Sequence, residues 1–348
     1  MNFSRKLLSL TLSLALACTL SPTGFATSHF SSISQSESQE EILENLRKHV
    51  AKYYYELSPE EQEQTIWEIY QEKYIIPAQE NNSLSLEDNA DSEDSEDNEA
   101  YEQMMEEETY IVDLINSMSD QQTTLDNWKY NLSFLQEHYT EIMALPDINV
   151  WFVNDYIDGY SVVLKNEGKP DEQINFSASG RSSYNASAAK SYALQYYKNY
   201  NPNYPDWGSE GGDCANFVSQ CVHAGGKPMK GTPGTSSAAD DWSNWFSSGT
   251  SLNTKKVSST WRGAAAFRGY WEDNASASKK FSSVGNSSFD FGYIGDAVSI
   301  LNTRGRAYHT LLIIDYDGKD FILAAHSGST ISKRLSSYNS DFVIYHMR

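Results

Sequence analysis

The chain has 348 residues, of which 47 are acidic and 26 basic, and its formal net charge is −21. A hydrophobic fraction of 39% and a charged fraction of 21% are typical of a folded protein, so disorder throughout the chain is excluded. The negative charge argues against a protein that binds nucleic acid through a cationic surface.

Residues 1–26 have the order of a secretory signal peptide. Arg5 and Lys6 precede an apolar run from residue 7 to residue 20, and the small residues Gly24 and Ala26 follow it. No later segment is apolar enough to stop transfer. The sequence therefore predicts cleavage after Ala26 and a secreted, extracellular or cell-wall protein with no transmembrane segment in its mature form. Lipidation of Cys18 is the alternative.

Charge divides the rest of the chain into two regions. Residues 28–182 hold 34 acidic and 8 basic side chains, whereas residues 183–348 hold 13 and 16. Such asymmetry indicates two regions with different roles.

The acidic region is predicted to be mostly helical, in three parts. Residues 27–84 show helical spacing, and Ser58-Pro59 predicts the start of a helix. Residues 85–108, with 12 carboxylates and no Lys or Arg from residue 87 onward, are predicted to be a disordered linker; the run lacks the glycine of an EF-hand calcium loop. Residues 109–182 are predicted to form a small helical region with a hairpin that turns at Asp158-Gly159. Nothing in the acidic region suggests catalysis, and its partners are not indicated.

Residues 183–348 carry the candidate chemistry. Gly211-Gly212-Asp213 precedes a helix-length run that starts at Cys214, where unpaired N–H groups and the helix dipole favour a thiolate. Cys221 is seven residues further on, roughly 10 Å along the same helix, which is too far for a disulfide. We expect Cys214 to be a nucleophile and Cys221 to be a packing residue.

Two histidines are candidates for the base that a thiol nucleophile needs. His309 and His326 lie in two strand-like segments joined by a turn at Asp317-Gly318. A two-residue loop would make them cross-strand neighbours about 5 Å apart on one face of the sheet, so that His326 could orient His309. Ser327 or a residue of 295–299 is an alternative orienting group. A zinc ion held by Cys214, His309 and His326 is a second interpretation, but no close-spaced ligand pair supports it.

Several of these segments resemble a known family. Residues 212–220, Gly-Asp-Cys-Ala-Asn-Phe-Val-Ser-Gln, together with residues 184–189, residues 201–204 and His309, resemble the putative amidase domain of exported bacterial proteins. That family resembles the NlpC/P60 and CHAP groups of papain-like cysteine peptidases. The resemblance implies an α+β fold in which the nucleophile's helix packs on an antiparallel sheet. No upstream glutamine matches the papain-type oxyanion donor.

The resemblance also implies a function. It implies cleavage of an amide bond, with bacterial cell-wall peptides as substrate, Cys214 as nucleophile, His309 as base and His326 as the third polar residue. Asp213, Trp207, Trp242 and Trp245 are expected to line the substrate cleft, and no cofactor or metal is expected. Two other functions remain open: an acyltransferase or transglutaminase that uses the same thiol, and a non-catalytic wall-binding or adhesin module.

Overall fold

The computed structural model describes residues 39–53, 58–70, 93–174, 184–208, 212–326 and 329–348. The predicted signal peptide, with Cys18, lies outside these residues. Among the described helices, none is long and apolar enough to cross a membrane.

In the part of the chain that the structure describes, two helices lie before residue 71. Helix α1 spans Gln39–Tyr53 and α2 spans Pro59–Tyr70. The predicted start of α2 is confirmed, since Ser58 lies just before it and its carbonyl oxygen accepts from the Gln62 N–H at 2.9 Å.

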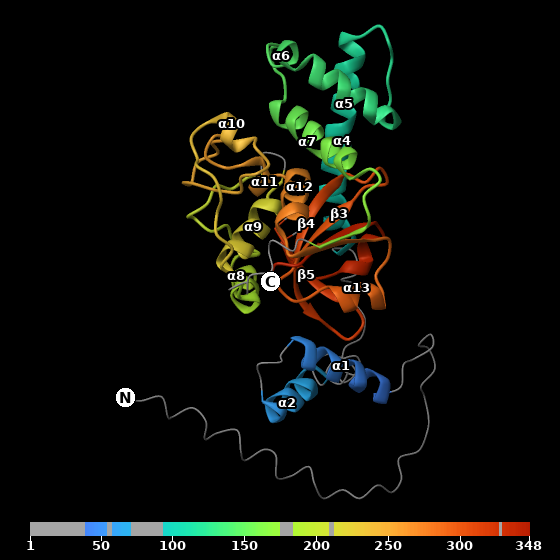
Figure 1. Ribbon diagram of the computed structural model, residues 1–348, viewed down its shortest axis with the longest axis vertical. Coiled ribbons are helices and arrows are strands. Elements are labelled where there is room, and N and C mark those ends of the chain that lie inside the picture. The colour runs from blue at the N-terminus through green and yellow to red at the C-terminus, as the bar shows by residue number, and fades with distance from the viewer. Residues whose placement is uncertain (1–38, 54–57, 71–92, 175–183, 209–211, 327–328) are drawn as a thin grey trace, which may run out of the picture. The chain divides into compact units, whose positions relative to one another are not determined.

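A helical region follows, built from α4 (Glu93–Met118), η3 (Leu125–Asn127), α5 (Trp128–Glu137), α6 (Tyr139–Ile142) and α7 (Val150–Asn166). Figure 1 shows these helices grouped beside one another. Their shared core comes from one apolar face of each of the longer helices and consists mainly of Ile111, Ile115, Leu132, Leu135, Ile142, Val153, Tyr156 and Tyr160.

The structure corrects two predictions in this region. Residues 93–108 of the predicted linker are helical, and Ala100, Met104, Glu107 and Glu108 are buried. Burial of apolar residues on one side of the run, and arginine partners for two of its carboxylates, make this acidic segment fold. The first part of the predicted linker, residues 85–92, lies outside the described part of the chain.

The predicted hairpin is instead α7. Asn149 caps this helix by accepting from the Phe152 N–H at 3.2 Å. Gly159 lies within this helix, and Arg306 packs against it. A Cβ added at Gly159 would lie 2.5 Å from Arg306 Nε. The glycine therefore permits a close approach and does not make a turn.

The C-terminal region is built on a seven-stranded sheet with the order β1-β2-β7-β3-β4-β5-β6, in which every neighbouring pair is antiparallel. The strands are β1 (Glu172–Ile174), β2 (Ala277–Phe281), β3 (Ala297–Leu301), β4 (Ala307–Tyr316), β5 (Phe321–Ala325), β6 (Thr330–Arg334) and β7 (Phe342–Tyr345). The helical elements are α8 (Ala186–Tyr196), α9 (Cys214–Ala224), α10 (Ser236–Ala239), α11 (Ser259–Arg262), α12 (Ala264–Asn274), α13 (Asn286–Phe291) and η5 (Leu335–Tyr338). The protein is thus an α+β fold with a helical N-terminal region, as predicted.

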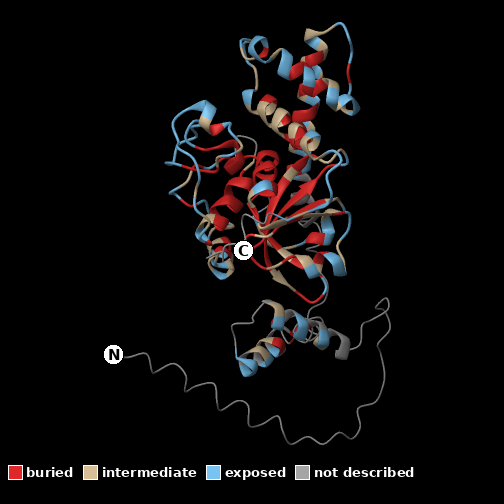
Figure 2. Cartoon of the chain, viewed as in Figure 1, coloured by how far each residue is buried: buried red, intermediate tan, exposed pale blue. Residues whose placement is uncertain are grey.

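The two faces of the sheet bury separate apolar clusters. The face that we call the α9 face packs Ala297, Leu301, Leu312 and Ala324 against α9 and α12. The opposite face, called the α13 face, packs Val298, Ile300, Leu311, Ile313 and Leu323 against side chains of α13 and η5. Burial on both faces is visible in Figure 2, where α9 and the central strands are red.

Candidate active site

Cys214 is the first residue of α9, as the sequence predicts, and Asp213 occupies the N-cap position. Gly212 precedes them with φ of +96°, a backbone conformation that side chains other than hydrogen disfavour. The turn needed to aim Cys214 at the sheet therefore depends on this glycine. Cys214 and Cys221 are both buried and unpaired, in agreement with the helical spacing argument.

The Cys214 thiol is buried on the α9 face, and only 7% of the residue is exposed. Burial raises the pKa of this thiol to about 12, although hydrogen bonds from the backbone of Thr310 and Ala215 act in the opposite direction. The predicted thiolate is therefore not the state of this structure, because loss of solvation outweighs the stabilisation at the helix end.

Asp213, the residue before Cys214, forms a buried hydrogen-bonded pair with His326. His326 Nδ1 lies 2.6 Å from Asp213 Oδ2, and its Nε2 lies 2.7 Å from the Tyr196 carbonyl oxygen. The ring also stacks on Phe217 of α9, with centroids 4.2 Å apart. The other oxygen of Asp213 accepts from the Trp207 backbone N–H at 2.9 Å and from Asn216 Nδ2 at 2.8 Å. Asp213 thus joins the start of α9 to the end of β5.

One of these contacts fixes the hydrogen on His326 Nε2. A carbonyl oxygen only accepts hydrogen bonds, so Nε2 must carry a hydrogen. In this arrangement Nε2 donates to the Tyr196 carbonyl oxygen and does not accept from the thiol.

The predicted register of the His309–His326 hairpin was wrong. Tyr316 pairs with Phe321 around a four-residue loop, and an irregularity between Ile313 and Asp315 shifts the pairing again. The loop is four residues long because Asp317 Oδ1 accepts from the backbone N–H groups of residues 319 and 320. The next pair is Leu312 with Ala324, and continuing that register places His326 beside Thr310.

A shift of one residue moves a strand side chain to the other face of the sheet. His309 pairs with Ile300, which belongs to the α13 face, and its ring lies 5.8 Å from that of Tyr338, which packs on the same face. Burial lowers the pKa of His309 to about 4, and its buried Nδ1 has no hydrogen-bond partner among the described residues. The structure therefore brings His326, but not His309, to the side of the sheet that holds Cys214.

The three predicted cleft tryptophans have different environments. Trp207 lines a cavity of about 1100 Å³. Trp242 is half-buried and donates from Nε1 to Asp158 at 3.1 Å. Trp245 is fully buried and donates to Ser219 at 3.1 Å, so it belongs to the core and the expectation of cleft contact was wrong for it. Asp213 lines a further cavity of about 620 Å³.

Helix α4 lies across Cys214, which the sequence did not predict. A cavity of about 30 Å³ contacts Cys214 and is also lined by Ala100, Met104 and Glu107 of α4. The 620 Å³ cavity, on the side of Asp213 and His326, is lined by the acidic residues of the same helix: Glu99, Glu102 and Glu106. Gln103 and Gly212 line both cavities, so α4 passes between them and covers the thiol.

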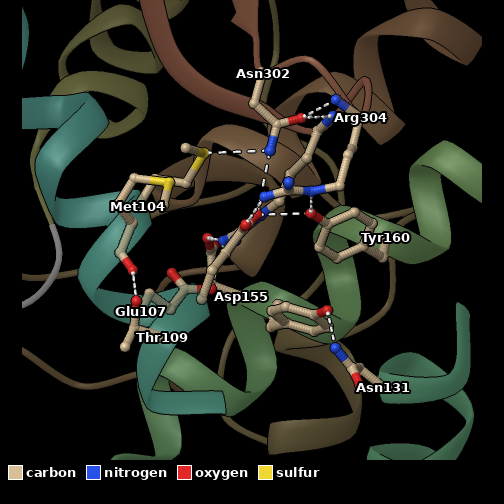
Figure 3. A network of polar contacts seen from close by, with 12 residues as sticks. Met104, Glu107, Thr109, Asn131, Asp155, Tyr160, Asn302 and Arg304 are labelled. Carbon is tan, nitrogen blue, oxygen red and sulfur yellow. Dashed lines mark hydrogen bonds and ion pairs between the residues drawn. The ribbon is translucent and has the colours of Figure 1, made fainter. Parts of the chain in front are cut away.

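Buried charges hold α4 in this position (Figure 3). Arg306 donates to Glu107 at 2.5 Å, to Asp155 of α7 at 2.7 Å and to Glu108 at 3.3 Å. Arg304 also pairs with Glu108. Burial raises the pKa of Glu107, and the Arg306 guanidinium opposes that rise. The helical spacing of the apolar residues within the acidic run was the sequence signal that could have revealed this contact.

Metal coordination finds no support in the described part of the chain, which contains no group of three or more His, Cys, Asp or Glu side chains placed to hold a metal ion. The zinc interpretation also requires His309 and Cys214 on one face, which the register does not allow.

Comparisons with known proteins point to one family. The model of the family described as putative amidase domain matches residues 183–346. The uncharacterized protein YhbB of Bacillus subtilis (strain 168) is 29% identical over 137 residues, which cover 36% of this chain and 41% of that protein. The chain thus aligns with less than half of this relative. No solved structure matches the chain. Residues 183–346, which contain Cys214, Asp213 and His326, therefore belong to the putative amidase domain family.

Proposed function

We propose that the protein hydrolyses an amide bond with Cys214 as its nucleophile, on a C-terminal fold related to papain-like cysteine peptidases. The observation that carries this proposal is the placement of Cys214 at the first turn of α9, beside the Asp213–His326 pair and on the same face of the sheet. Family membership supports amide hydrolysis as the reaction. A thiol, an imidazole and a carboxylate that orients it are the groups that such catalysis needs.

The reaction proceeds in two steps. The imidazole takes the proton of the Cys214 thiol, the thiolate attacks the amide carbon, the C–N bond breaks, and the amine leaves with the proton that the imidazolium returns. The resulting thioester is attacked by water, whose proton passes to the now neutral imidazole, and a carboxylic acid leaves as the thiolate is restored. The backbone N–H of Cys214, at the helix start, stabilises the oxyanion in both steps.

His326, not His309, is assigned here as the imidazole of the mechanism. His326 lies on the Cys214 side of the sheet and is bonded to Asp213, the residue before the nucleophile. To serve the thiol, its Nε2 must leave the Tyr196 carbonyl oxygen, to which it is bonded in this structure. His309, the base that the family resemblance implies, would have to cross the sheet.

Location and substrate complete the proposal. Residues 1–26 would export the chain, and the amide would lie in peptides of the bacterial cell wall. The resemblance of the segment around Cys214 to wall-directed amidases supports both parts of the proposal.

The test is digestion of purified cell-wall peptidoglycan by the full chain, followed by mass spectrometry of the released fragments. We expect fragments with new amino and carboxyl ends from the wild type and from Cys221→Ala, and none from Cys214→Ala. Cys221 is the matched control because it is also a buried, unpaired thiol of α9. Equal activity of Cys214→Ala and the wild type would end the proposal, and fragments that carry an added amine would indicate acyl transfer instead.

The same assay distinguishes the two histidines. We expect His326→Gln to lose hydrolysis and His309→Gln to retain it wherever the variant is folded. The reverse pattern would leave the thiol mechanism in place and transfer the role of base to His309.

A further inference from the structure

Arg262 is a buried cation in the cleft next to Cys214. It is the last residue of α11, and only 7% of it is exposed. Its guanidinium lies against two indole rings, with the central carbon 4.6 Å from the ring centroid of Trp151 and 5.4 Å from that of Trp207. The two indoles are themselves stacked, at 24° between their planes. These rings fix the direction of the guanidinium through cation–π contact.

The guanidinium has no ionic partner in contact. Among the described residues no carboxylate oxygen lies within 4.0 Å of Arg262, and its buried Nε has no hydrogen-bond partner. Asp158, Asp240 and Asp155 act on the guanidinium from beyond contact distance and oppose the lowering of its pKa by burial. Two of these carboxylates have partners elsewhere, because Asp155 pairs with Arg306 and Asp158 accepts from Trp242. A buried charged group without a partner is unfavourable, so an anion is expected to bind there.

Two cavities meet at this side chain. The cavity of about 1100 Å³, formed by α7 and residues 236–263, is lined by Trp151, Asp155, Arg262 and Gly263. The same four residues line the small cavity that contacts Cys214. Arg262 therefore stands where a molecule in the large cleft would approach the thiol.

We propose that Arg262 determines substrate specificity by binding a carboxylate of the substrate in the cleft that leads to Cys214. This inference rests on the proposed function, and it names the substrate class as an amide that carries a free carboxylate near the scissile bond. A planar guanidinium held by two rings suits bidentate binding of a carboxylate. Asp158 and Asp240 line the same cleft, so a zwitterion, which also carries an ammonium group, fits better than a dicarboxylate.

The test measures binding and does not require turnover. Isothermal titration calorimetry compares alanylalanine, which has a free carboxylate, with alanylalanine amide, on the full chain carrying Cys214→Ala. We expect the acid to bind about ten- to a hundredfold more tightly than the amide. Arg262→Gln should abolish this preference, and Arg262→Lys should keep part of it because the charge remains without the planar fork.

Arg47→Gln is the matched control, since it removes the same charge from α1 at a residue that lines neither cavity. It should leave the preference unchanged. Circular dichroism shows whether Arg262→Gln is folded. If it is not, the comparison of acid and amide on the protein that keeps Arg262 still tests the inference.

Equal binding of acid and amide would overturn the inference, as would a preference retained by folded Arg262→Gln or no binding of the acid at about 10 mM. Failure of the proposed hydrolysis is a separate result. An inactive protein that still prefers the acid would disprove the reaction and keep the binding site.

Discussion

At the scale of residues, the site combines a buried thiol with a histidine whose two ring nitrogens are already bonded to other groups. The pKa of Cys214 is raised to about 12 by burial, and both nitrogens of His326 are bonded to oxygen atoms. Transfer of the Cys214 side chain to a wetter environment would lower the cost of its ionisation. The groups that the proposed reaction requires are therefore gathered but not activated, and the proposal requires solvent access to Cys214.

The buried His309 makes the stability of the protein depend on pH. Burial lowers its pKa to about 4, whereas the unfolded chain titrates near 6.5. Between these values the unfolded state binds more protons than the folded state, so the free energy of unfolding decreases as pH falls from 6.5 towards 4. We expect the wild type to lose about 2 kcal/mol from this residue between pH 8 and pH 5.

This prediction is checked by urea denaturation of the wild type and His309→Gln at both pH values. The variant should show a smaller loss of stability on acidification. His138→Gln, at a histidine whose side chain is 41% exposed, is the control for replacing a histidine elsewhere in the chain. An identical pH dependence for all three proteins would show that His309 is not buried as a neutral ring.

At the scale of elements, sequence patterns predicted the helix that begins at Cys214 and the two strands that carry His309 and His326, but not the register between those strands. Register depends on one residue more or less in a loop. Asp317 stabilises four residues where the Asp-Gly pair suggested two, and Ile314 adds an irregularity that no local pattern marks. The longer loop shifts the pairing by two residues and keeps the faces, so the irregularity, a shift of one residue, is what puts His309 and His326 on opposite faces.

Long-range contacts explain why the sequence patterns wrongly predicted a hairpin at Gly159 and disorder in the acidic run. Residues 150–166 contain a glycine that suits a turn, yet they are helical, and the glycine makes room for Arg306, far along the chain. Likewise, carboxylates of α4 are buried only because Arg304 and Arg306 meet them. The partner of a charge cannot be deduced from the residues around it in the sequence.

The cover that α4 places over Cys214 leads to a second prediction. Met104 is 4% exposed and lines the small cavity at the thiol, and Asn302 donates to its sulfur at 3.4 Å. Truncating a buried Met to Ala costs about 2 kcal/mol or more of packing. We expect Met104→Ala to loosen α4 over the site and to raise the rate of Cys214 alkylation by iodoacetamide at pH 8 roughly tenfold.

Peptide mass spectrometry measures that rate at Cys214 and Cys221 separately. Met118→Ala is the control, because Met118 belongs to the same helix but packs in the core of the helical region and lines neither cavity. Equal acceleration in the two variants would mean that the thiol is reached by general unfolding and that α4 is not a specific cover.

At the scale of the whole molecule, the acidic helical region and the amidase domain share buried charge. Residues 43–348 form one compact unit. Arg306 of the amidase domain is 1% exposed and has its carboxylate partners on α4 and α7. The acidic region therefore completes the folded state of the amidase domain, in addition to covering its thiol, and the two regions should unfold together.

Removing one partner of a buried ion pair tests this coupling. Glu107→Gln takes a carboxylate from a guanidinium that water cannot reach, and such a loss costs about 3 kcal/mol. The matched change Glu102→Gln, at an exposed residue of the same helix, should alter the free energy of unfolding by less than about 0.5 kcal/mol. Urea denaturation followed by tryptophan fluorescence and by circular dichroism gives both values. We expect coincident transitions for both probes in all three proteins, with only Glu107→Gln displaced to lower urea. Separate transitions for the helical region and the sheet, or equal stability of the two variants, would contradict a shared folding unit.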